Sequence, residues 1–355
     1  MPVLSVTFAP TPAIPFSRHR IPSATKIQCC SSSQANNGYA SSTFPEKQRL
    51  ASSSVAGKVP PPRPHRIILV RHGESEGNVD ESVYTRTADP KISLTEKGKA
   101  QARECGKAIR EMIKKDGIES WKVYFYVSPY RRTRETLRFV GRAFERSRIA
   151  GVREEPRLRE QDFGIELFGT NLQFSRGKKG NFQDREKMRV EKKLRNLYGR
   201  FFFRFPDGES AADVYDRITG FRETLRSDID IGRFQPPGDR NPGMNLVIVS
   251  HGLTLRVFLM RWYKWTVEQF HGLNNFGNGR MMVMEKGYGG RYSLAMHHTE
   301  DELRKFGLTD DMLADQEWQK FAKPGELNYD CPMLTSFFTH FDDERSTSDS
   351  KLIMP

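Results

Sequence analysis

The residues of this chain that could do chemistry begin with Arg71, His72 and Gly73, which directly follow a short apolar run over residues 66–70. The run is rich in β-branched residues, a pattern that predicts a strand buried in a sheet. A guanidinium and an imidazole at the end of such a strand need an anionic partner, because an unpaired buried charge is costly. Gly73 lets the backbone turn and approach a ligand closely. The simplest such ligand is a phosphate; the alternative is a structural His beside a surface Arg.

A second run of the same kind, residues 245–250, ends in His251 and Gly252 and leads into an apolar, helix-like segment. A third strand-like run leads into a serine and several arginines, among them Arg132. A further extended stretch ends at Glu160. In open α/β sheets, ligands bind where the strands end. We therefore expect two imidazoles, several guanidinium groups and one carboxyl group to meet at one sheet edge.

These residue types suit phosphoryl transfer through a covalent intermediate, which requires a nucleophile, an anion pocket and an acid for the leaving oxygen. His72 is the candidate nucleophile, because much of an imidazole is neutral near pH 7 and Arg71 flanks it. Arg71 and Arg132 would grip the phosphoryl oxygens in two-point geometry. His251 would supply a further donor, and Glu160 would protonate the leaving alkoxide and then help to activate water. We expect no metal ion or other cofactor, because the cationic side chains perform the charge stabilisation.

Six short motifs occur in a fixed order along the chain, and together they are much more specific than any one of them. They are Arg71-His72-Gly73 with Asn78, Leu94-Thr95 with Gly98 and Gln101-Ala102, Ser128 with Arg132 and Thr136, Leu158-Arg159-Glu160, Gly208-Glu209-Ser210, and Ser250-His251-Gly252. The ordered set resembles the histidine phosphatase superfamily, and within it the plant branch of phosphoglycerate mutase-like proteins. The resemblance implies the roles given above and adds Asn78, Gly73 and Gly252 as substrate-binding residues.

Two assignments stay open on the residues alone. Arg132 competes with Arg131 and Arg134, which lie within one predicted helix turn, and only its spacing from Ser128 in the shared motif singles it out. Glu160 has an alternative as a surface acid paired with Arg157 or Arg159, a contact that contributes little by itself.

The elements that must position these residues alternate between strands and helices. Residues 97–112 show apolar positions at helical spacing, and Thr95 could cap the start of that helix. Ser210 fits the start of another helix, with Glu209 left as a candidate for a place behind the site. This alternation predicts an α/β fold, a three-layer α/β/α sandwich with a mostly parallel central sheet. Strand signals lie near residues 66–70, 122–127, 245–249 and 280–285.

The first part of the chain differs in kind from the rest. It is rich in Ser, Pro, Ala and Thr and has no Asp or Glu before Glu46, a composition that cannot bury a core and is typical of organelle transit peptides. We expect residues 1–62 to be a disordered transit peptide and Pro-rich linker that targets the chloroplast. The alternatives are a mitochondrial presequence or an ordinary tail on a cytoplasmic protein. No apolar run is long enough to cross a membrane.

The remaining sequence predicts a phosphatase domain over residues 63–298. A C-terminal extension over residues 299–355 should be helical as far as residue 323 and irregular beyond it. Relative to the family pattern, sixteen residues, Ile165–Gly180, intervene close to Glu160. We expect this insert to be either a lineage-specific surface loop or an error in the transcript, since loop closure costs grow only slowly with length.

Basic residues outnumber acidic ones, with a formal charge of +13 that falls to +8 without residues 1–59. Much of the excess lies in Arg176–Arg204, which holds eleven basic residues against three acidic ones. The stretch has three interpretations: a solvated helix face, a lid that steers anionic substrates, or a nucleic-acid surface. The last is the least favoured, because the aromatics cluster at one end of the stretch.

The sequence therefore predicts a metal-independent phosphatase that hydrolyses a phosphomonoester of a small metabolite through phospho-His72. A phosphoglycerate mutase is the first alternative. The glycolytic mutases that the chain resembles have a Trp before the Asn of this motif, however, and this chain has Gly77 before Asn78. A catalytically weak protein that binds phosphorylated ligands or a partner is the second. The sequence does not indicate an oligomeric state.

Overall fold

The computed structural model of the chain describes residues 61–164, 185–236 and 239–329, all within a compact unit that spans Lys58–Pro355. The predicted transit peptide up to residue 60, the insert 165–180 and the end of the C-terminal extension lie outside the described residues.

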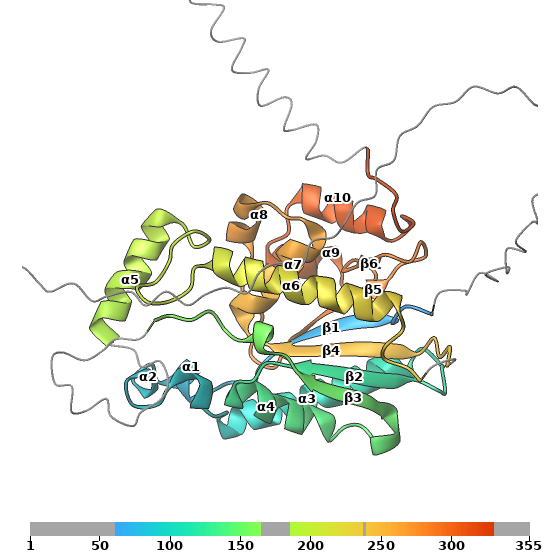
Figure 1. Ribbon diagram of the computed structural model, residues 1–355, viewed down its shortest axis with the longest axis horizontal. Coiled ribbons are helices and arrows are strands. Elements are labelled where there is room, and N and C mark those ends of the chain that lie inside the picture. The colour runs from blue at the N-terminus through green and yellow to red at the C-terminus, as the bar shows by residue number, and fades with distance from the viewer. Residues whose placement is uncertain (1–60, 165–184, 237–238, 330–355) are drawn as a thin grey trace, which may run out of the picture. The chain divides into compact units, whose positions relative to one another are not determined.

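A six-stranded sheet forms the centre of this unit, in the order β3-β2-β4-β1-β5-β6 (Figure 1). The four strands β3, β2, β4 and β1 pair in parallel, whereas β5 pairs antiparallel with both of its neighbours, β1 and β6. The strands are β1 (Arg66–Arg71), β2 (Lys122–Val127), β3 (Ile149–Glu154), β4 (Met244–Ser250), β5 (Met281–Lys286) and β6 (Tyr292–Ser293).

Helices cover both faces of the sheet. The α-helices are α1 (Glu76–Val79), α2 (Val83–Arg86), α3 (Glu96–Lys114), α4 (Arg131–Gly141), α5 (Arg185–Tyr198), α6 (Ala211–Asp230), α7 (Gly252–Tyr263), α8 (Val267–Gly272), α9 (Glu300–Phe306) and α10 (Asp310–Gln319). Three 3-10 turns are η1 (Asp89–Lys91), η2 (Arg146–Arg148) and η3 (Pro156–Leu158). None of the described helices is long and apolar enough to span a bilayer.

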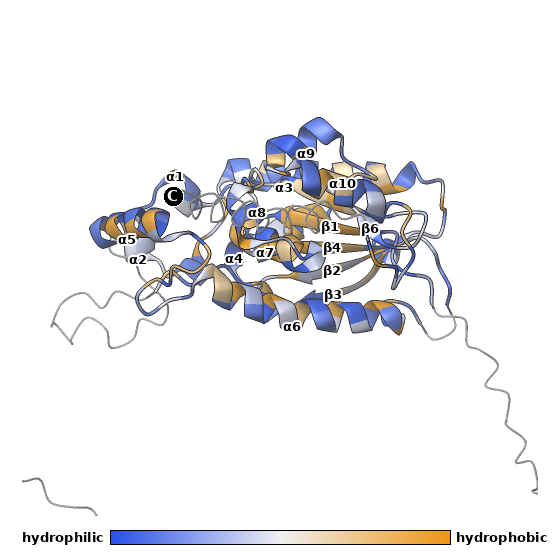
Figure 2. Cartoon of the chain, turned by 90° about the horizontal axis from the view of Figure 1, so that it is seen from above, coloured by the Kyte–Doolittle hydropathy of each residue, from blue (hydrophilic) through white to orange (hydrophobic). Residues whose placement is uncertain are grey.

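The alternation of side chains along each strand divides the interior into two cores. In β1, Ile67 and Leu69 face the core beneath α6 and α7, while Ile68 and Val70 face the core beneath α3 and α4. β1 is therefore apolar at every interior position, as a strand covered on both faces must be. In Figure 2 the central strands β1 and β4 are orange and the outer surface of α9 is blue. The predicted three-layer α/β/α fold is confirmed.

The local predictions are also met at most elements. The four predicted strands are present as β1, β2, β4 and β5, and the helix predicted for residues 97–112 is α3. Thr95 caps that helix, since its Oγ1 accepts a hydrogen bond from the Gly98 amide at 3.0 Å. Ser210 begins α6 with a reciprocal capping box.

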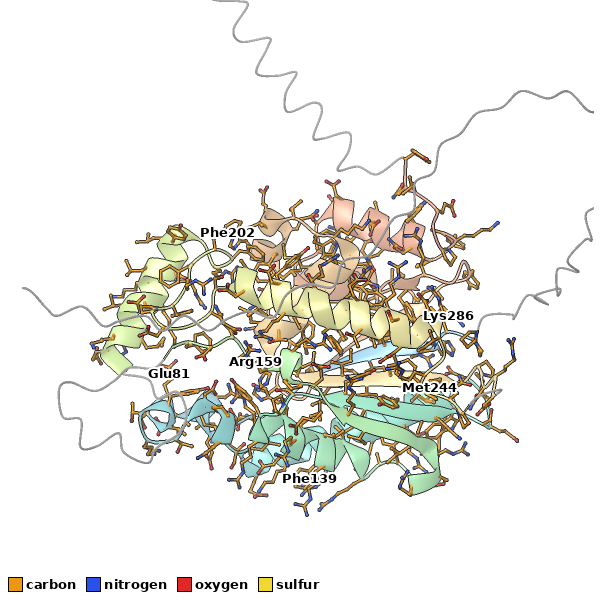
Figure 3. All side chains as sticks on the ribbon, in the orientation of Figure 1. Glu81, Phe139, Arg159, Phe202, Met244 and Lys286 are labelled. Atoms are coloured by element: carbon orange, nitrogen blue, oxygen red, sulfur yellow. The ribbon has the colours of Figure 1, made fainter. Side chains whose placement is uncertain are left out.

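The arrangement brings the carboxyl ends of three strands to one edge. The parallel register pairs Arg71 at the end of β1 with Ser250 at the end of β4, and Val127 of β2 with Val249. Arg159 is labelled at this edge in Figure 3, whereas Met244 and Lys286 mark the opposite edge. Residues that directly follow β1, β2 and β4 therefore meet.

Candidate active site

The two predicted histidines lie side by side at the carboxyl edge of the sheet. His72 follows β1 and His251 follows β4, and their ring centroids are 5.3 Å apart with an angle of 63° between the planes. Both side chains are buried. His251 is also the N-cap of α7, so the positive end of that helix begins beside the pair.

A hydrogen bond at Nδ1 fixes which ring nitrogen of His72 carries the proton. Nδ1 lies 2.7 Å from the Gly73 carbonyl oxygen, which can only accept, so Nδ1 carries the proton. The lone pair of a neutral ring is then on Nε2. Burial lowers the pKa of His72 well below its usual 6.5, and the nearby charges of Arg132 and Arg71 lower it further. The structure thus favours a neutral imidazole, the form that can act as a nucleophile.

The second imidazole has one nitrogen engaged and one free. His251 Nε2 lies 2.8 Å from Ser128 Oγ. Nδ1 is buried and makes no hydrogen bond within the described residues; the nearest acidic oxygen, Glu160 Oε2, is 3.9 Å away. Burial lowers the pKa of His251 well below 6.5 as well, with Arg132 adding to the effect. A buried polar nitrogen without a partner marks a place where a ligand oxygen can bind.

Arg132, rather than its two neighbours, reaches this pocket. It is 3% exposed, and its Nη1 donates to the Asp89 backbone oxygen at 2.8 Å and to Asp89 Oδ1 at 2.6 Å. Burial disfavours the charge, but Asp89, Tyr84 and Glu160 together outweigh this effect and raise the pKa of Arg132. Arg131 and Arg134 are exposed and pair with carboxylates on the surface. The Arg132 interaction with Asp89 uses only Nη1, so Nη2 and Nε remain for an anion.

Arg71 has no carboxylate partner among the described residues. Its Nη1 donates to the Phe276 carbonyl, and its Nε is buried without a hydrogen bond. Burial lowers the pKa of Arg71, opposed by the charge of Glu160. A half-buried arginine held in this way is a ready site for an oxyanion, because the guanidinium fork matches two phosphate oxygens.

Glu160 lies beside His251 and is not a surface acid. Its side chain is 14% exposed, and its Oε1 accepts from the Gln161 amide at 3.1 Å and from Thr254 Oγ1 at 3.3 Å. Burial raises the pKa of Glu160 despite the opposing charge of Arg132. A carboxyl group with a raised pKa is protonated over a wider pH range, which suits a general acid.

The loop that carries Glu160 is held from behind by a buried ion pair. Glu209 accepts from Arg217 Nε and Nη2, each at 3.0 Å, and from the Asp162 amide at 3.0 Å. Arg217 Nη2 also donates to the Glu160 carbonyl at 3.1 Å. Arg159, which the sequence offered as a partner for Glu160, bonds to Glu209 instead. Glu209 therefore lies behind the site and positions the loop.

The three predicted substrate-binding residues differ in their surroundings. Asn78 is exposed, and its Oδ1 accepts from the Ser75 amide and from Asn278 Nδ2, both at 3.0 Å, which turns its amide nitrogen outward. The Gly73 amide donates to Thr136 at 3.0 Å, and a Cβ there would lie 2.3 Å from the Gly98 carbonyl. A Cβ on Gly252 would lie 2.7 Å from Asn275 Oδ1. Gly73 is thus needed for packing against α3, and Gly252 for the close approach of Asn275.

Two residues of the site were not found by sequence reasoning. Asp89 anchors Arg132, and Asn278 donates to the His72 carbonyl at 3.2 Å as well as to Asn78. Asp89 lies in a 3-10 turn and Asn278 in a loop before β5, so neither belongs to a periodic pattern. The only signal was an Asp beside Pro, which predicts a turn and no partner.

Among the described residues, no group of three or more His, Cys, Asp or Glu side chains is arranged to hold a metal ion. The polar groups that converge on the pocket are two imidazoles, two guanidinium groups and a carboxyl group. Such a set can bind a phosphoryl group, offer it a nitrogen nucleophile and supply a proton.

Comparison with known proteins gives a consistent result. Residues 67–299 match the histidine phosphatase superfamily (branch 1). The chain is 53% identical over 291 residues to phosphoglycerate mutase-like protein AT74 of Arabidopsis thaliana, covering 81% of this chain and 85% of that protein. It is 32% identical to the broad-range acid phosphatase DET1 of Saccharomyces cerevisiae, covering 63% of this chain and 86% of that protein.

A solved structure of similar fold is a mycobacterial glucosyl-3-phosphoglycerate phosphatase, with a TM-score of 0.44 and 21% identity, covering 62% of this chain and 91% of that chain.

Proposed function

Because the chain belongs to the histidine phosphatase superfamily, we propose that it is a phosphatase that hydrolyses a phosphomonoester of a small metabolite through a phosphohistidine on His72. The observation that carries the proposal is the orientation of His72. Its Nδ1 is engaged by the Gly73 carbonyl at 2.7 Å, so the free lone pair is on Nε2, and Arg132 and Arg71 lie close enough for their charges to lower the pKa of the ring.

In the first step, His72 Nε2 attacks phosphorus in line with the ester oxygen, so the P–N bond forms as the P–O bond breaks. Arg71 and Arg132 hold the equatorial oxygens and stabilise their charge. His251 donates from Nδ1 to a phosphoryl oxygen, since its Nε2 is taken by Ser128. The protonated Glu160 carboxyl gives its proton to the leaving alkoxide.

In the second step, water replaces the alcohol. The Glu160 carboxylate takes a proton from this water, whose oxygen attacks phosphorus as the P–N bond breaks. Inorganic phosphate leaves, and both His72 and Glu160 return to their starting protonation states. The guanidinium groups stabilise charge in both steps, so we propose that activity needs no metal ion.

Phosphatase activity is favoured over mutase activity by two observations. The yeast relative is named a broad-range acid phosphatase. This chain also has Gly77 before Asn78, where a bulky Trp would help to enclose an intermediate. A mutase must retain its intermediate and exclude water.

The test is acid-free trapping of the phosphoenzyme from p-nitrophenyl phosphate with a chelator present, in wild type and His72→Ala. We expect a phosphate adduct on wild type that is stable in alkali and labile in acid, mapped to His72, with release of inorganic phosphate. An adduct at another residue, or turnover that requires added metal ion, would refute the mechanism. Transfer to a second alcohol without release of phosphate would identify a mutase.

We also propose delivery to the chloroplast through residues 1–62, supported by their acid-poor, hydroxylated composition. A fusion of these residues to a fluorescent protein should enter plastids in plant cells. Accumulation in mitochondria or the cytoplasm would contradict the proposal.

A further inference from the structure

A row of arginine side chains extends from the active site along one short backbone segment, residues 271–276. Arg71, Arg256 and Arg200 come from β1, α7 and the turn after α5, and each donates to a carbonyl of this segment. Consecutive Cα atoms are about 3.8 Å apart, so the segment is shorter than about 20 Å. The three bonds run from Arg71 Nη1 to Phe276 O, from Arg256 Nη1 to Leu273 O at 3.0 Å and from Arg200 Nη2 to His271 O.

Arg256 is a buried cation that the described protein does not neutralise. It is 6% exposed, its guanidinium carbon lies 5.6 Å from the centre of the Phe270 ring, and it forms no ion pair within the described residues. Burial lowers its pKa to about 10, and the charge of Arg200 contributes. Leaving a guanidinium buried without a counter-ion is costly.

Arg195 adds a third guanidinium to Arg256 and Arg200. It lies in the last turn of α5, its Nε is buried without a hydrogen bond, and its guanidinium carbon lies 5.7 Å from the centre of the Phe205 ring. Burial lowers its pKa, and neighbouring Arg200 lowers it further. Neither Arg195 nor Arg200 pairs with a carboxylate in the described part of the chain.

The other basic residues of α5 behave differently. Lys193 is exposed, Arg189 pairs with Glu186 at 2.9 Å, and Lys192 pairs with Glu81 at 2.8 Å. The described part of the basic stretch, residues 185–204, therefore contains a solvated face and two partly buried arginines, Arg195 and Arg200. In Figure 1, α5 lies with α1 and α2 beyond the sheet edge that carries the active site.

A purely structural role accounts for part of this arrangement. Arg200 and Arg256 bond to carbonyls at the end of α8, where the last turn of any helix lacks intrahelical partners. Those bonds use one nitrogen of each side chain, and a second nitrogen of Arg256, Nε, donates to the Gly252 carbonyl at 3.4 Å. They do not explain why three like charges gather, without a carboxylate of their own, next to the phosphate pocket.

We propose that Arg195, Arg200 and Arg256 form a second oxyanion subsite, which holds another phosphate or carboxylate of the substrate while the scissile phosphate lies against Arg71 and His72. This inference rests on the proposed phosphatase function. It narrows the substrate class to small metabolites with two anionic groups separated by a short spacer. Guanidinium groups suit this role because they bind carboxylate and phosphate in two-point geometry and stay charged.

The test compares non-hydrolysable ligands, so that it does not depend on turnover. Butane-1,4-bisphosphonate, 5-phosphonopentanoate and butylphosphonate are titrated into the full chain by calorimetry. The first two carry a second anion of different kind, and the third carries none. Charge-assisted hydrogen bonds should make wild type bind at least one of the dianionic ligands about tenfold tighter than butylphosphonate. Tighter binding of the bisphosphonate would identify phosphate as the preferred second group, and tighter binding of 5-phosphonopentanoate would identify carboxylate.

The double variant Arg195→Gln/Arg200→Gln should reduce this preference to about twofold or less, which is the statistical advantage of a symmetric ligand. Lys193→Gln removes a charge from the solvated face of the same helix and should keep the full preference. Arg195→Gln alone, in a half-buried position, serves if the double variant fails to fold, and should give an intermediate preference.

Equal affinity of wild type for all three ligands, or an unchanged preference in the arginine variants, would overturn the subsite. If Lys193→Gln lost the preference for dianionic ligands to the same extent, the preference would come from the overall positive charge of α5 and not from a subsite. Hydrolysis of p-nitrophenyl phosphate by wild type is measured alongside. Its presence without a dianion preference refutes the subsite alone, whereas its absence refutes the phosphatase function independently of the affinities.

Discussion

The two ends of β1 carry the same pair of residue types in opposite circumstances. At the start of the strand, Arg66 donates to Asp116 at 2.7 Å and to Glu285 at 2.8 Å, and His65 lies 3.5 Å from each of the same carboxylates. At the end, Arg71 and His72 bond to backbone carbonyls. Among the described residues, neither of them forms an ion pair.

This difference distinguishes a structural cluster from a ligand site better than residue type does. Arg66 at the first end is neutralised within the protein, so that end needs no ligand. At the second end the acid that acts on Arg71 is Glu160, whose raised pKa makes it a weaker counter-charge. An arginine held in place by the fold and left without a carboxylate partner is suited to binding a phosphoryl group.

The largest expected effect comes from replacing His72 and His65, the histidines at the two ends of β1, with alanine one at a time. His72→Ala removes the nucleophile and should lower kcat for p-nitrophenyl phosphate by about ten-thousandfold or more. His65→Ala, at the other end of the same strand, should keep kcat within about twofold. Steady-state kinetics on folded protein, checked by circular dichroism, measures both. Comparable losses in the two variants would mean that the ends do not differ in function.

Glu160→Gln should produce the next largest effect, and one that depends on the substrate. Without an acid, an alkyl phosphate with a poor leaving group should lose about a hundredfold or more in kcat, because general acid catalysis contributes roughly that much. p-Nitrophenyl phosphate, whose leaving group needs no proton, should lose about tenfold at most.

The pH profile of the same variant is a second measurement. In wild type, kcat/KM should fall at alkaline pH as Glu160 loses its proton, and the raised pKa of Glu160 moves this fall toward neutrality. In Glu160→Gln the alkaline limb should disappear. Equal loss on both substrates with an unchanged profile would show that Glu160 is not the acid.

Sequence reasoning succeeded where a residue lies in a strong local pattern. β1 and β4 are buried on both faces and therefore read as unbroken apolar runs, and their ends locate His72 and His251. β3 was missed, because it is an edge strand in which half-buried and exposed positions alternate and none is fully buried. Its composition, with Gly151 and Arg153 in the middle, gives little strand signal.

The site was only partly accessible to the same reasoning. Arg132 could be chosen over Arg131 only by resemblance, since burial of one helix position is a tertiary property. Asp89 is 43 residues away from Arg132 in sequence, so their buried ion pair has no local signature. Arg195 and Arg200 were visible only as part of the excess charge of Arg176–Arg204, and the fold decides which side chains there lack a carboxylate partner.

Arg66→Gln and Arg71→Gln should separate stability from activity. Arg66→Gln leaves the largely buried Asp116 and Glu285 carboxylates with only His65, 3.5 Å from each, which should lower the free energy of unfolding by about 3 kcal/mol. Arg71→Gln should leave the free energy of unfolding within about 1 kcal/mol of wild type, because no carboxylate loses its partner. Its kcat should fall about a hundredfold, as for loss of one donor to a developing charge. Urea unfolding and kinetics on both variants make the comparison; a stability loss in Arg71→Gln equal to that in Arg66→Gln would contradict it.

The smallest effect concerns the acid sensitivity of folding. Burial lowers the pKa of His72 and His251 below 6.5, so the unfolded chain binds more protons at these sites than the folded one. Stability is then full above pH 6.5 and falls as the pH drops toward the folded values, by up to about 1.4 kcal/mol per pH unit for each histidine. At the other end of β1, Arg66 and His65 lower the pKa of Glu285, whose contribution is lost only below its usual 4.5. The free energy of unfolding, measured in urea between pH 7 and pH 5, should therefore fall as the pH drops. The double variant His72→Asn/His251→Asn should show a flatter dependence on pH. An unchanged slope in that variant would mean that the catalytic edge is not the part of the fold that first responds to acid.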